Sequence, residues 1–316
     1  MSASAQRRTS DETVGFLSTL SAYLLWGVLP IYFLILAPTG AWETVAWRIV
    51  FSVVFCLVAL AITRGWSRVI AVFRNPKLAA LTALGGGLVY INWQLFVLAA
   101  QGGQVVESSL GYFINPIVSV LLGVLALHER LRALQWTAIG VAALAVIVIV
   151  IGYGEMPWIS LGLAFSFGFY GLVKNRIGPS VDAVSGLTLE TVWLLPVAII
   201  QLVVVAITSG ITIGVGGIGH VALIAGLGIT TAVPLLLFAI GTRRIPLTMV
   251  GILQFAAPIL QFLVGVFLLH EPMPPERWIG FGIVWVAVVI LVTDSLMAGR
   301  RARASVARAE AEAVDR

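Results

Sequence analysis

The chain consists of long apolar runs separated by short polar connections. A helix needs about 20 apolar residues to cross a bilayer, and ten runs reach or approach that length. They cover residues 14–36, 43–63, 78–99, 106–127, 134–151, 157–173, 186–208, 219–241, 248–269 and 278–297. The runs are apolar on every face and lack the two-residue alternation of membrane β-strands. The pattern therefore predicts an all-α polytopic membrane protein with ten transmembrane helices.

Composition supports a membrane protein. Hydrophobic residues make up 60% of the 316 residues and charged residues only 10%, whereas soluble domains carry about 25% charged residues. So few charged side chains are not enough to form the water-facing surface of a soluble protein. The single cysteine, Cys56, lies inside an apolar run, so it has no partner for an intrachain disulfide.

The basic residues orient the predicted helices. Seventeen of the 19 Lys and Arg residues fall on one side of the membrane if there are ten spans and both termini are cytoplasmic. The exceptions are Arg48, inside the second run, and Arg277, in the last connection. We therefore expect a multi-pass membrane protein with a cytoplasmic tail over 1–12. The charged tail over 298–316 is expected to be disordered or a surface helix.

An internal repeat divides the chain. The stretch "NPIVSVLLGVLALHERLRALQW" at 115–136 parallels "APILQFLVGVFLLHEPMPPERW" at 257–278, and 8 of 14 positions are identical between 116–129 and 258–271. The offset of 142 residues also places Gly86 over Gly228. The predicted repeats are 13–151 and 152–297, with five helices each. Because five is odd, the second copy enters the membrane from the opposite side.

Inverted repeats are a common construction of secondary transporters, in which two halves alternate access to a site near the bilayer midplane. Two alternatives remain at this point. An intramembrane enzyme would need a nucleophile with its base, or a metal cluster, and the sequence offers neither motif, so we expect no catalytic residue, metal or cofactor. A non-transporting scaffold or sensor would have closed polar contacts and no cavity between its halves.

The motifs also resemble a known family. The doubled five-helix unit resembles the EamA-type drug/metabolite transporter superfamily, and "AYLLWGVLP", "ETVAWRIVFS" and "SLGYFINP" resemble its RarD-like subfamily. The resemblance covers about residues 13–297. It implies a ten-helix inner-membrane exporter or permease of small metabolites, with amino acids and drugs among the candidates, and says little about the substrate.

Two prolines related by the repeat are candidate hinges. Pro116 and Pro258 each lie about ten residues into a predicted helix, roughly 15 Å deep and thus near the midplane. Each proline frees the carbonyl four residues earlier, that of Tyr112 or of Gln254. These carbonyls, with Asn115, would line a central cavity. The alternative is a packed kink repaired by neighbouring helices.

Charged residues inside the runs are candidate substrate-pathway groups. Arg48 lies near the predicted external end of its helix, and Glu107 opens another helix from the same side. The two would form either a substrate-facing pair or a structural ion pair between helices. Glu190 is the approximate counterpart of Arg48 in the second repeat, and would bind a substrate amine or a proton, or only a neighbouring helix.

Polar residues of the third run complete the candidate pathway. Asn92 and Gln94 point about 200° apart on a helix, so at least one should face the interior, together with Tyr112. With no soluble ATPase domain, a gradient must drive transport. Proton coupling would fall to Glu43, Glu107 or Glu190, and facilitated export is equally compatible. The expected partners are a small-molecule solute and the lipid bilayer, with no nucleic acid; the oligomeric state stays open.

Overall fold

The computed structural model describes residues 3–127, 131–153, 156–177 and 180–314, and this part of the chain is helical with no strand. The first half contains α1 (Ala3–Leu34), α2 (Ala41–Thr63), α3 (Trp66–Arg74), α4 (Pro76–Gln101), α5 (Val105–Leu127) and α6 (Ala133–Tyr153). The second half contains α7 (Trp158–Ile177), α8 (Ala183–Thr208), α9 (Gly217–Thr242), α10 (Leu247–Leu253), α11 (Ala256–Leu263), the π-helix η2 (Val264–Leu268) and α12 (Pro275–Val314).

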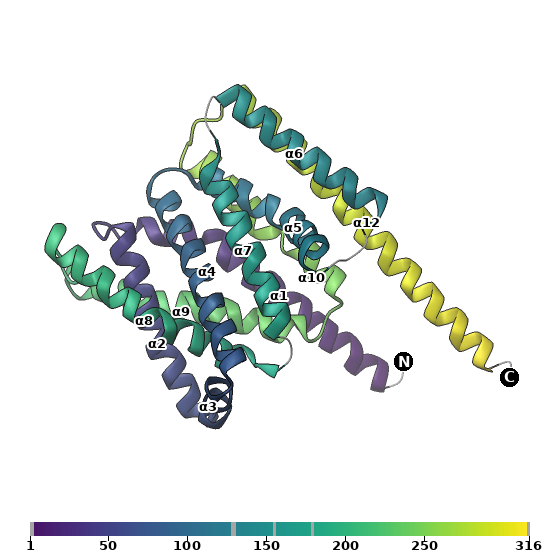
Figure 1. Cartoon of the computed structure of the whole chain (residues 1–316), viewed down its shortest axis with the longest axis horizontal. Coiled ribbons are helices and arrows are strands. Elements are labelled where there is room, and N and C mark those ends of the chain that lie inside the picture. Colours follow the sequence, from purple (N-terminus) through teal and green to yellow (C-terminus); the bar gives the residue numbers. More distant parts are fainter. Residues whose placement is uncertain (1–2, 128–130, 154–155, 178–179, 315–316) are drawn as a thin grey trace.

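The predicted all-α polytopic membrane fold is confirmed. Within the described residues, nine helical stretches are long and apolar enough to cross a membrane, and α10, α11 and η2 together form one of them. The remaining helix of the predicted ten, α7, is not among these nine, and it is less apolar because its last turn carries Lys174 and Arg176. It packs along α4 and α5 in the bundle. Both chain ends lie toward the same side of the molecule (Figure 1), as an even number of crossings requires.

The packing of the helices follows the inverted repeat. In the first half, α1 packs against α9 and α11 of the second; in the second half, α7 packs against α4 and α5 of the first. The pair α2–α9 likewise has its counterpart in α8–α4. The pairs α2–α8, α5–α11 and α6–α12 join equivalent helices of the two halves, and α6 and α12 run side by side at one edge (Figure 1). Exchanging the halves therefore maps each contact between unlike helices onto its counterpart, and each contact between equivalent helices onto itself.

Two glycines at the repeat offset allow the closest of these approaches. A Cβ on Gly86 of α4 would lie 2.9 Å from the backbone oxygen of Glu190 on α8. A Cβ on Gly228 of α9 would meet the backbone oxygen of Phe51 on α2 even more closely. Small residues at such points let membrane helices pack backbone against backbone. The glycines therefore set the spacing of two equivalent helix pairs.

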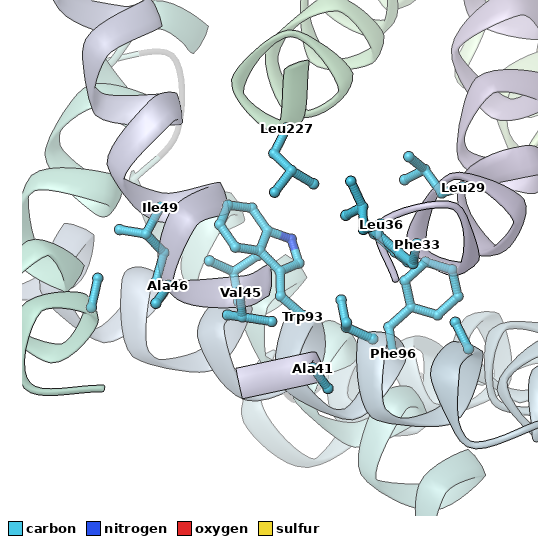
Figure 2. Packing of buried hydrophobic residues seen from close by; sticks show 14 of the residues in the cluster. Leu29, Phe33, Leu36, Ala41, Val45, Ala46, Ile49, Trp93, Phe96 and Leu227 are labelled. Carbon is cyan, nitrogen blue, oxygen red and sulfur yellow. The ribbon is translucent and has the colours of Figure 1, made fainter. Parts of the chain in front are cut away.

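One hydrophobic cluster joins the halves. It gathers buried residues from α1, α2, α4, α7, α8 and α9, and Figure 2 shows Trp93 of α4 with Val45 of α2 and Leu227 of α9 around it. The rings of Phe33 and Phe96 meet edge to face nearby, with centroids 5.8 Å apart. Because this cluster draws on both repeats, a polar group placed inside it lies at their junction.

The predicted helix 248–269 is broken in the structure. It is divided at Gln254 and Phe255 into α10 and α11, and its last turns are the π-helix η2. Pro258 lies in the first turn of α11, where a missing N–H costs nothing. Its counterpart Pro116 lies inside the continuous helix α5. The two repeat-related prolines thus have different local structures.

The second connection and both chain ends are helical. The connection between the second and third spans contains a helix, α3, which packs against α4 and α8. Arg68 of α3 approaches Asp182, the N-cap of α8, at 3.6 Å. Partial burial acts to raise the pKa of Asp182, but hydrogen bonds from Ser185 and the charge of Arg68 bring it below its usual value. At both ends of the chain, the predicted tails continue α1 and α12 as helix.

Candidate functional site

Arg48 is the central charge of the candidate site. Its side chain is 4% exposed, and its Nε donates to Oγ1 of Thr231 on α9 at 2.9 Å. The guanidinium carbon lies 4.2 Å from the ring centroid of Trp93 and 5.7 Å from that of Phe33. The terminal nitrogen Nη1 is buried and has no hydrogen-bond partner. Arg48 is therefore a buried cation held by aromatic faces and one hydroxyl.

Arg48 and Glu107 both lie in the described part of the chain, and they do not form a salt bridge in this structure. The Glu107 carboxylate accepts from the backbone N–H of Ile159 at 3.2 Å, and its backbone oxygen accepts from the hydroxyl of Ser160 at 2.6 Å. Glu107 therefore joins α5 to the first turn of α7, where a carboxylate meets the positive end of a helix.

Asn92 and Gln94 are both buried, and they face different neighbours. The Asn92 amide donates to the backbone oxygen of Leu163 on α7 and to Ser166, each at 3.1 Å. Its oxygen accepts from the Tyr112 hydroxyl at 3.0 Å. Gln94 points to α8, where its oxygen accepts from Nε2 of Gln201 at 3.1 Å. The two side chains thus join α4 to two helices of the other half.

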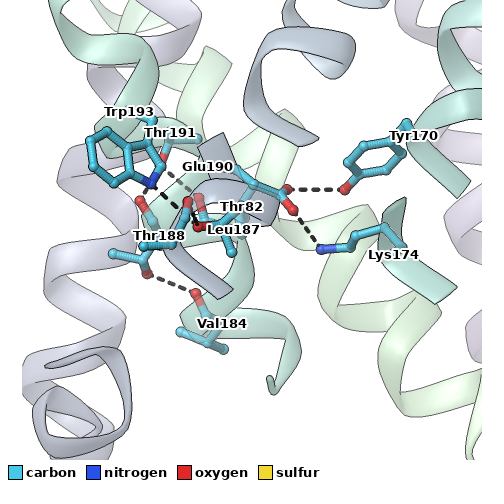
Figure 3. A network of polar contacts seen from close by, with 10 residues as sticks. Thr82, Tyr170, Lys174, Val184, Leu187, Thr188, Glu190, Thr191 and Trp193 are labelled. Atoms are coloured by element: carbon cyan, nitrogen blue, oxygen red, sulfur yellow. Dashed lines mark hydrogen bonds and ion pairs between the residues drawn. The ribbon is translucent and has the colours of Figure 1, made fainter. Parts of the chain in front are cut away.

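Glu190 has a cationic partner that the sequence analysis missed. It is 1% exposed, and Oε1 accepts from Nζ of Lys174 at 2.7 Å while Oε2 accepts from the Tyr170 hydroxyl at 3.0 Å (Figure 3). Sequence reasoning assigned Lys174 to a connection, because the apolar run ends at residue 173. The helix continues to Ile177 and carries the lysine back against α8. The spacing of Tyr170 and Lys174, one helical turn, was the available signal.

The residues around the two prolines do not share one environment. Asn115 on α5 is buried, and its Oδ1 has no hydrogen-bond partner. Gln254 at the helix break donates to the backbone oxygen of Gly251 at 2.9 Å, so its side chain is engaged within its own segment. The backbone oxygen of Pro258 accepts from the hydroxyl of Ser109 at 2.7 Å. The break between α10 and α11 therefore rests against α5.

A second glutamine near this break has an unpartnered atom. Gln261 of α11 is buried and donates weakly to the backbone oxygen of Trp26 at 3.3 Å, while its Oε1 has no partner. Trp26 packs against the same hydrophobic cluster that surrounds Arg48. A lone glutamine in an apolar run carries no spacing signal that would mark Gln261 as a site residue.

Two carboxylates hold connections at the end of the bundle predicted to be external. Glu43 accepts from the backbone N–H groups of Thr212 and Ile213 and from the Thr212 hydroxyl, at 2.8–3.1 Å. Glu271 accepts from the first two N–H groups of α5, those of Val105 at 2.6 Å and Val106 at 2.9 Å. Glu271 thus joins the connection before α12 to the start of α5. The repeat counterpart of the His270–Glu271 pair, residues 128 and 129, lies outside the described residues.

A small apolar pocket lies between the halves, away from Arg48. It is lined by side chains of α2, α8 and α9, with Cys56, Leu187 and Leu236 among them. Its lining holds no charged residue. A polar substrate would therefore find its hydrogen-bond partners around Arg48 and not here.

Comparison with known proteins agrees with this architecture. Residues 13–151 match the EamA-like transporter family. The RarD protein of Streptomyces exfoliatus is 43% identical, over 93% of both chains. The uncharacterized transporter YojE of Bacillus subtilis is 39% identical, over 92% of this chain and 97% of that one. A crystal structure at 20% identity has a TM-score of 0.54, covers 92% of this chain and 99% of its own, and supports the fold alone. The chain therefore belongs to the EamA-like transporter family, in its RarD-like branch, and is a multi-pass membrane transporter.

Proposed function

We propose that the protein is a secondary transporter, an exporter or permease of small metabolites, amino acids or drugs, that works by alternating access. The observation that carries this proposal is the buried, partly unsatisfied polar group at the junction of two inverted halves. Arg48 and Asn92 come from the first half, and Thr231 and Leu163, which they contact, come from the second. A solute bound there would touch both halves at once, as an alternating-access carrier requires.

The polar contacts at the two ends of the bundle are candidate gates. At the predicted external end, Glu271 binds α5 and Glu43 binds the loop before α9. At the predicted cytoplasmic end, Lys174 pairs with Glu190, and Arg132 pairs with Asp294 of α12, with Nε at 2.9 Å from the carboxylate. Opening either end would break the contacts there. Pro116 and the α10–α11 break would absorb the bending.

The same contacts constrain the energy source. Glu190, Glu43 and Glu107 are the acidic candidates for proton coupling, and each accepts hydrogen bonds in this conformation. Protonating a carboxylate removes its strongest attraction for a cation or for backbone N–H groups. A proton taken up by Glu190 would therefore release Lys174 and loosen the cytoplasmic end. Facilitated export without a coupled proton remains the alternative, in the inner membrane of a bacterium.

A non-transporting scaffold is the competing function, since many interior polar groups make closed contacts. The unpartnered atoms of Arg48, Asn115 and Gln261 argue against it, because a scaffold gains nothing from buried groups without partners.

Uptake by proteoliposomes that contain the full-length chain separates the two. A panel of labelled amino acids and small metabolites would be tested with and without an imposed pH gradient, beside protein-free vesicles. The proposal expects at least one solute to enter faster with protein, and expects Arg48→Ala to slow that entry. Correctly inserted protein that moves no solute would favour the scaffold.

A further inference from the structure

We propose that Arg48 is an anion subsite that binds the carboxylate group of a small solute with an apolar body; the inference rests on the proposed transport function. The ligand's carboxylate would accept from Nη1 of Arg48, the buried terminal nitrogen that has no partner. Trp93 and Phe33 lie against the guanidinium and would contact the apolar part.

Arg48 has no acidic partner in the described part of the chain, because no carboxylate there lies within salt-bridge distance. Glu43, one turn and a half away on the same helix, is occupied by Thr212 and Ile213. Glu107, from the same membrane side, accepts from Ile159. The protein therefore supplies no counter-charge to Arg48. A counter-charge would stabilise this cation more than an exposed one, because Arg48 is buried.

The contacts that Arg48 does make are weaker than the cost of burying it. Two aromatic faces and one hydroxyl attract the cation. A buried charge without a counter-ion is nevertheless costly, and a buried donor without an acceptor adds to that cost. An acceptor at Nη1 would remove that last cost.

The second repeat provides an internal comparison. Glu190 occupies the position 142 residues after Arg48, and it is as deeply buried. There the protein places Lys174 at 2.7 Å and the Tyr170 hydroxyl at 3.0 Å from the charge. The same fold can thus neutralise a buried charge at this position, and at Arg48 it does not. The unpaired state of Arg48 is a local property of the first repeat.

The chemistry of the guanidinium selects the class of ligand. Arginine has only donors, so a ligand there must accept, which excludes an ammonium group. Because Nε is taken by Thr231, the remaining edge presents terminal N–H groups suited to a planar carboxylate. The surrounding rings favour an organic anion over a small hydrated ion.

Thermal unfolding of the purified full-length protein in detergent tests the subsite without any measurement of flux. The probes are acetate, phenylacetate and indole-3-acetate, each beside its neutral amide, at constant ionic strength, with a chloride titration as a separate arm. We expect at least one aromatic carboxylate at saturation to raise Tm by roughly 2 °C or more, and its amide to raise it by much less. Equal shifts by acid and amide, no shift by any carboxylate, or a shift by chloride alone would each overturn the proposal.

Variants at Arg48 test whether the preference for acid over amide arises at this residue. Arg48→Gln should abolish the preference for acid over amide, and Arg48→Lys should weaken it, since lysine retains the charge without the planar fork. The control is Arg74→Gln, which removes an exposed arginine of α3 and should leave the preference unchanged. If Arg48→Gln does not fold, the comparison of acid with amide on the natural protein still decides. Selective binding without flux in proteoliposomes would refute transport and retain the subsite. Flux of solutes without selectivity for the acid over the amide would refute the subsite and retain transport.

Discussion

Arg48 and Glu190 occupy the same position of the two repeats, and each places a charge inside the bundle. Sequence alone predicted both as intramembrane charges, because charges interrupt apolar runs visibly. It did not predict their partners. The depth of a residue in the membrane follows from its position along a helix in the sequence. The rotation of that helix about its own axis, relative to the neighbouring helices, does not. For this reason the sequence could not decide whether Arg48 pairs with Glu107, and it missed the Lys174–Glu190 pair.

The Lys174–Glu190 pair gives a prediction at the residue scale. Lys174→Met should lower stability by about 1–3 kcal/mol, because it leaves a buried carboxylate with only the Tyr170 hydroxyl. The lysine side chain is 37% exposed, which keeps the loss below that of a fully buried pair. Adding Glu190→Gln should recover most of the loss. Thermal unfolding of the single and double variants measures this, and additive losses would show that the two residues are not coupled.

Glu271 gives a second prediction at this scale. Glu271→Gln should lower stability by about 0.5–2 kcal/mol, because the carboxylate caps the first two N–H groups of α5 and its charge favours that helix end. Thermal unfolding with Glu12→Gln as the exposed control measures the difference. An unchanged melting temperature in Glu271→Gln would show that the cap contributes little.

At the scale of elements, the helices were predicted well and their interruptions were not. Apolar runs report where lipid surrounds a segment, so ten crossings followed from the pattern. The break at Gln254 could not be read from Pro258, because Pro116 in the same repeat position leaves α5 continuous. What differs is the packing around each proline, and the sequence does not show it.

The repeat-related glycines allow an element-scale prediction with a control on the same helix. Gly228→Ala should separate α9 from α2, and Gly86→Ala should separate α4 from α8, because each new Cβ meets a backbone oxygen of the facing helix. We expect each to cost about 1–3 kcal/mol, as overpacked cores do. Gly87→Ala meets nothing within 4 Å and should be neutral or slightly stabilising. Thermal unfolding compares the three; a loss in Gly87→Ala equal to the others would refute the contact argument.

The proline in α5 links an element to transport. Pro116→Ala restores an N–H donor in the helix interior, where proline is unfavourable by about 3 kcal/mol. We expect a melting temperature equal to or above that of the natural protein, together with slower solute flux, because the hinge stiffens. Flux and thermal unfolding measured on the same preparation check both parts. Flux equal to that of the natural protein would remove Pro116 as a hinge.

At the scale of the whole molecule, the repeat in the sequence and the pairing of helices in the structure describe the same symmetry. Identical residues at the 142-residue offset predicted two copies, and an odd number of helices predicted their opposite orientation. The contacts of α1 with α9 and α11, and of α7 with α4 and α5, follow that symmetry. The interior contacts that would bind a solute could not be predicted from the sequence, because they join residues from opposite halves.

The opposite orientation of the halves is the claim on which the carrier mechanism depends, and cysteine labelling in intact cells tests it most directly. In a Cys56→Ala background, Gln104→Cys and Arg243→Cys place single thiols in the exposed connections before α5 and before α10. A membrane-impermeant maleimide should label Gln104→Cys from outside, and should label Arg243→Cys only after the cells are permeabilised. Labelling of both from the same side would mean that the repeats are parallel, and the alternating-access account would be wrong.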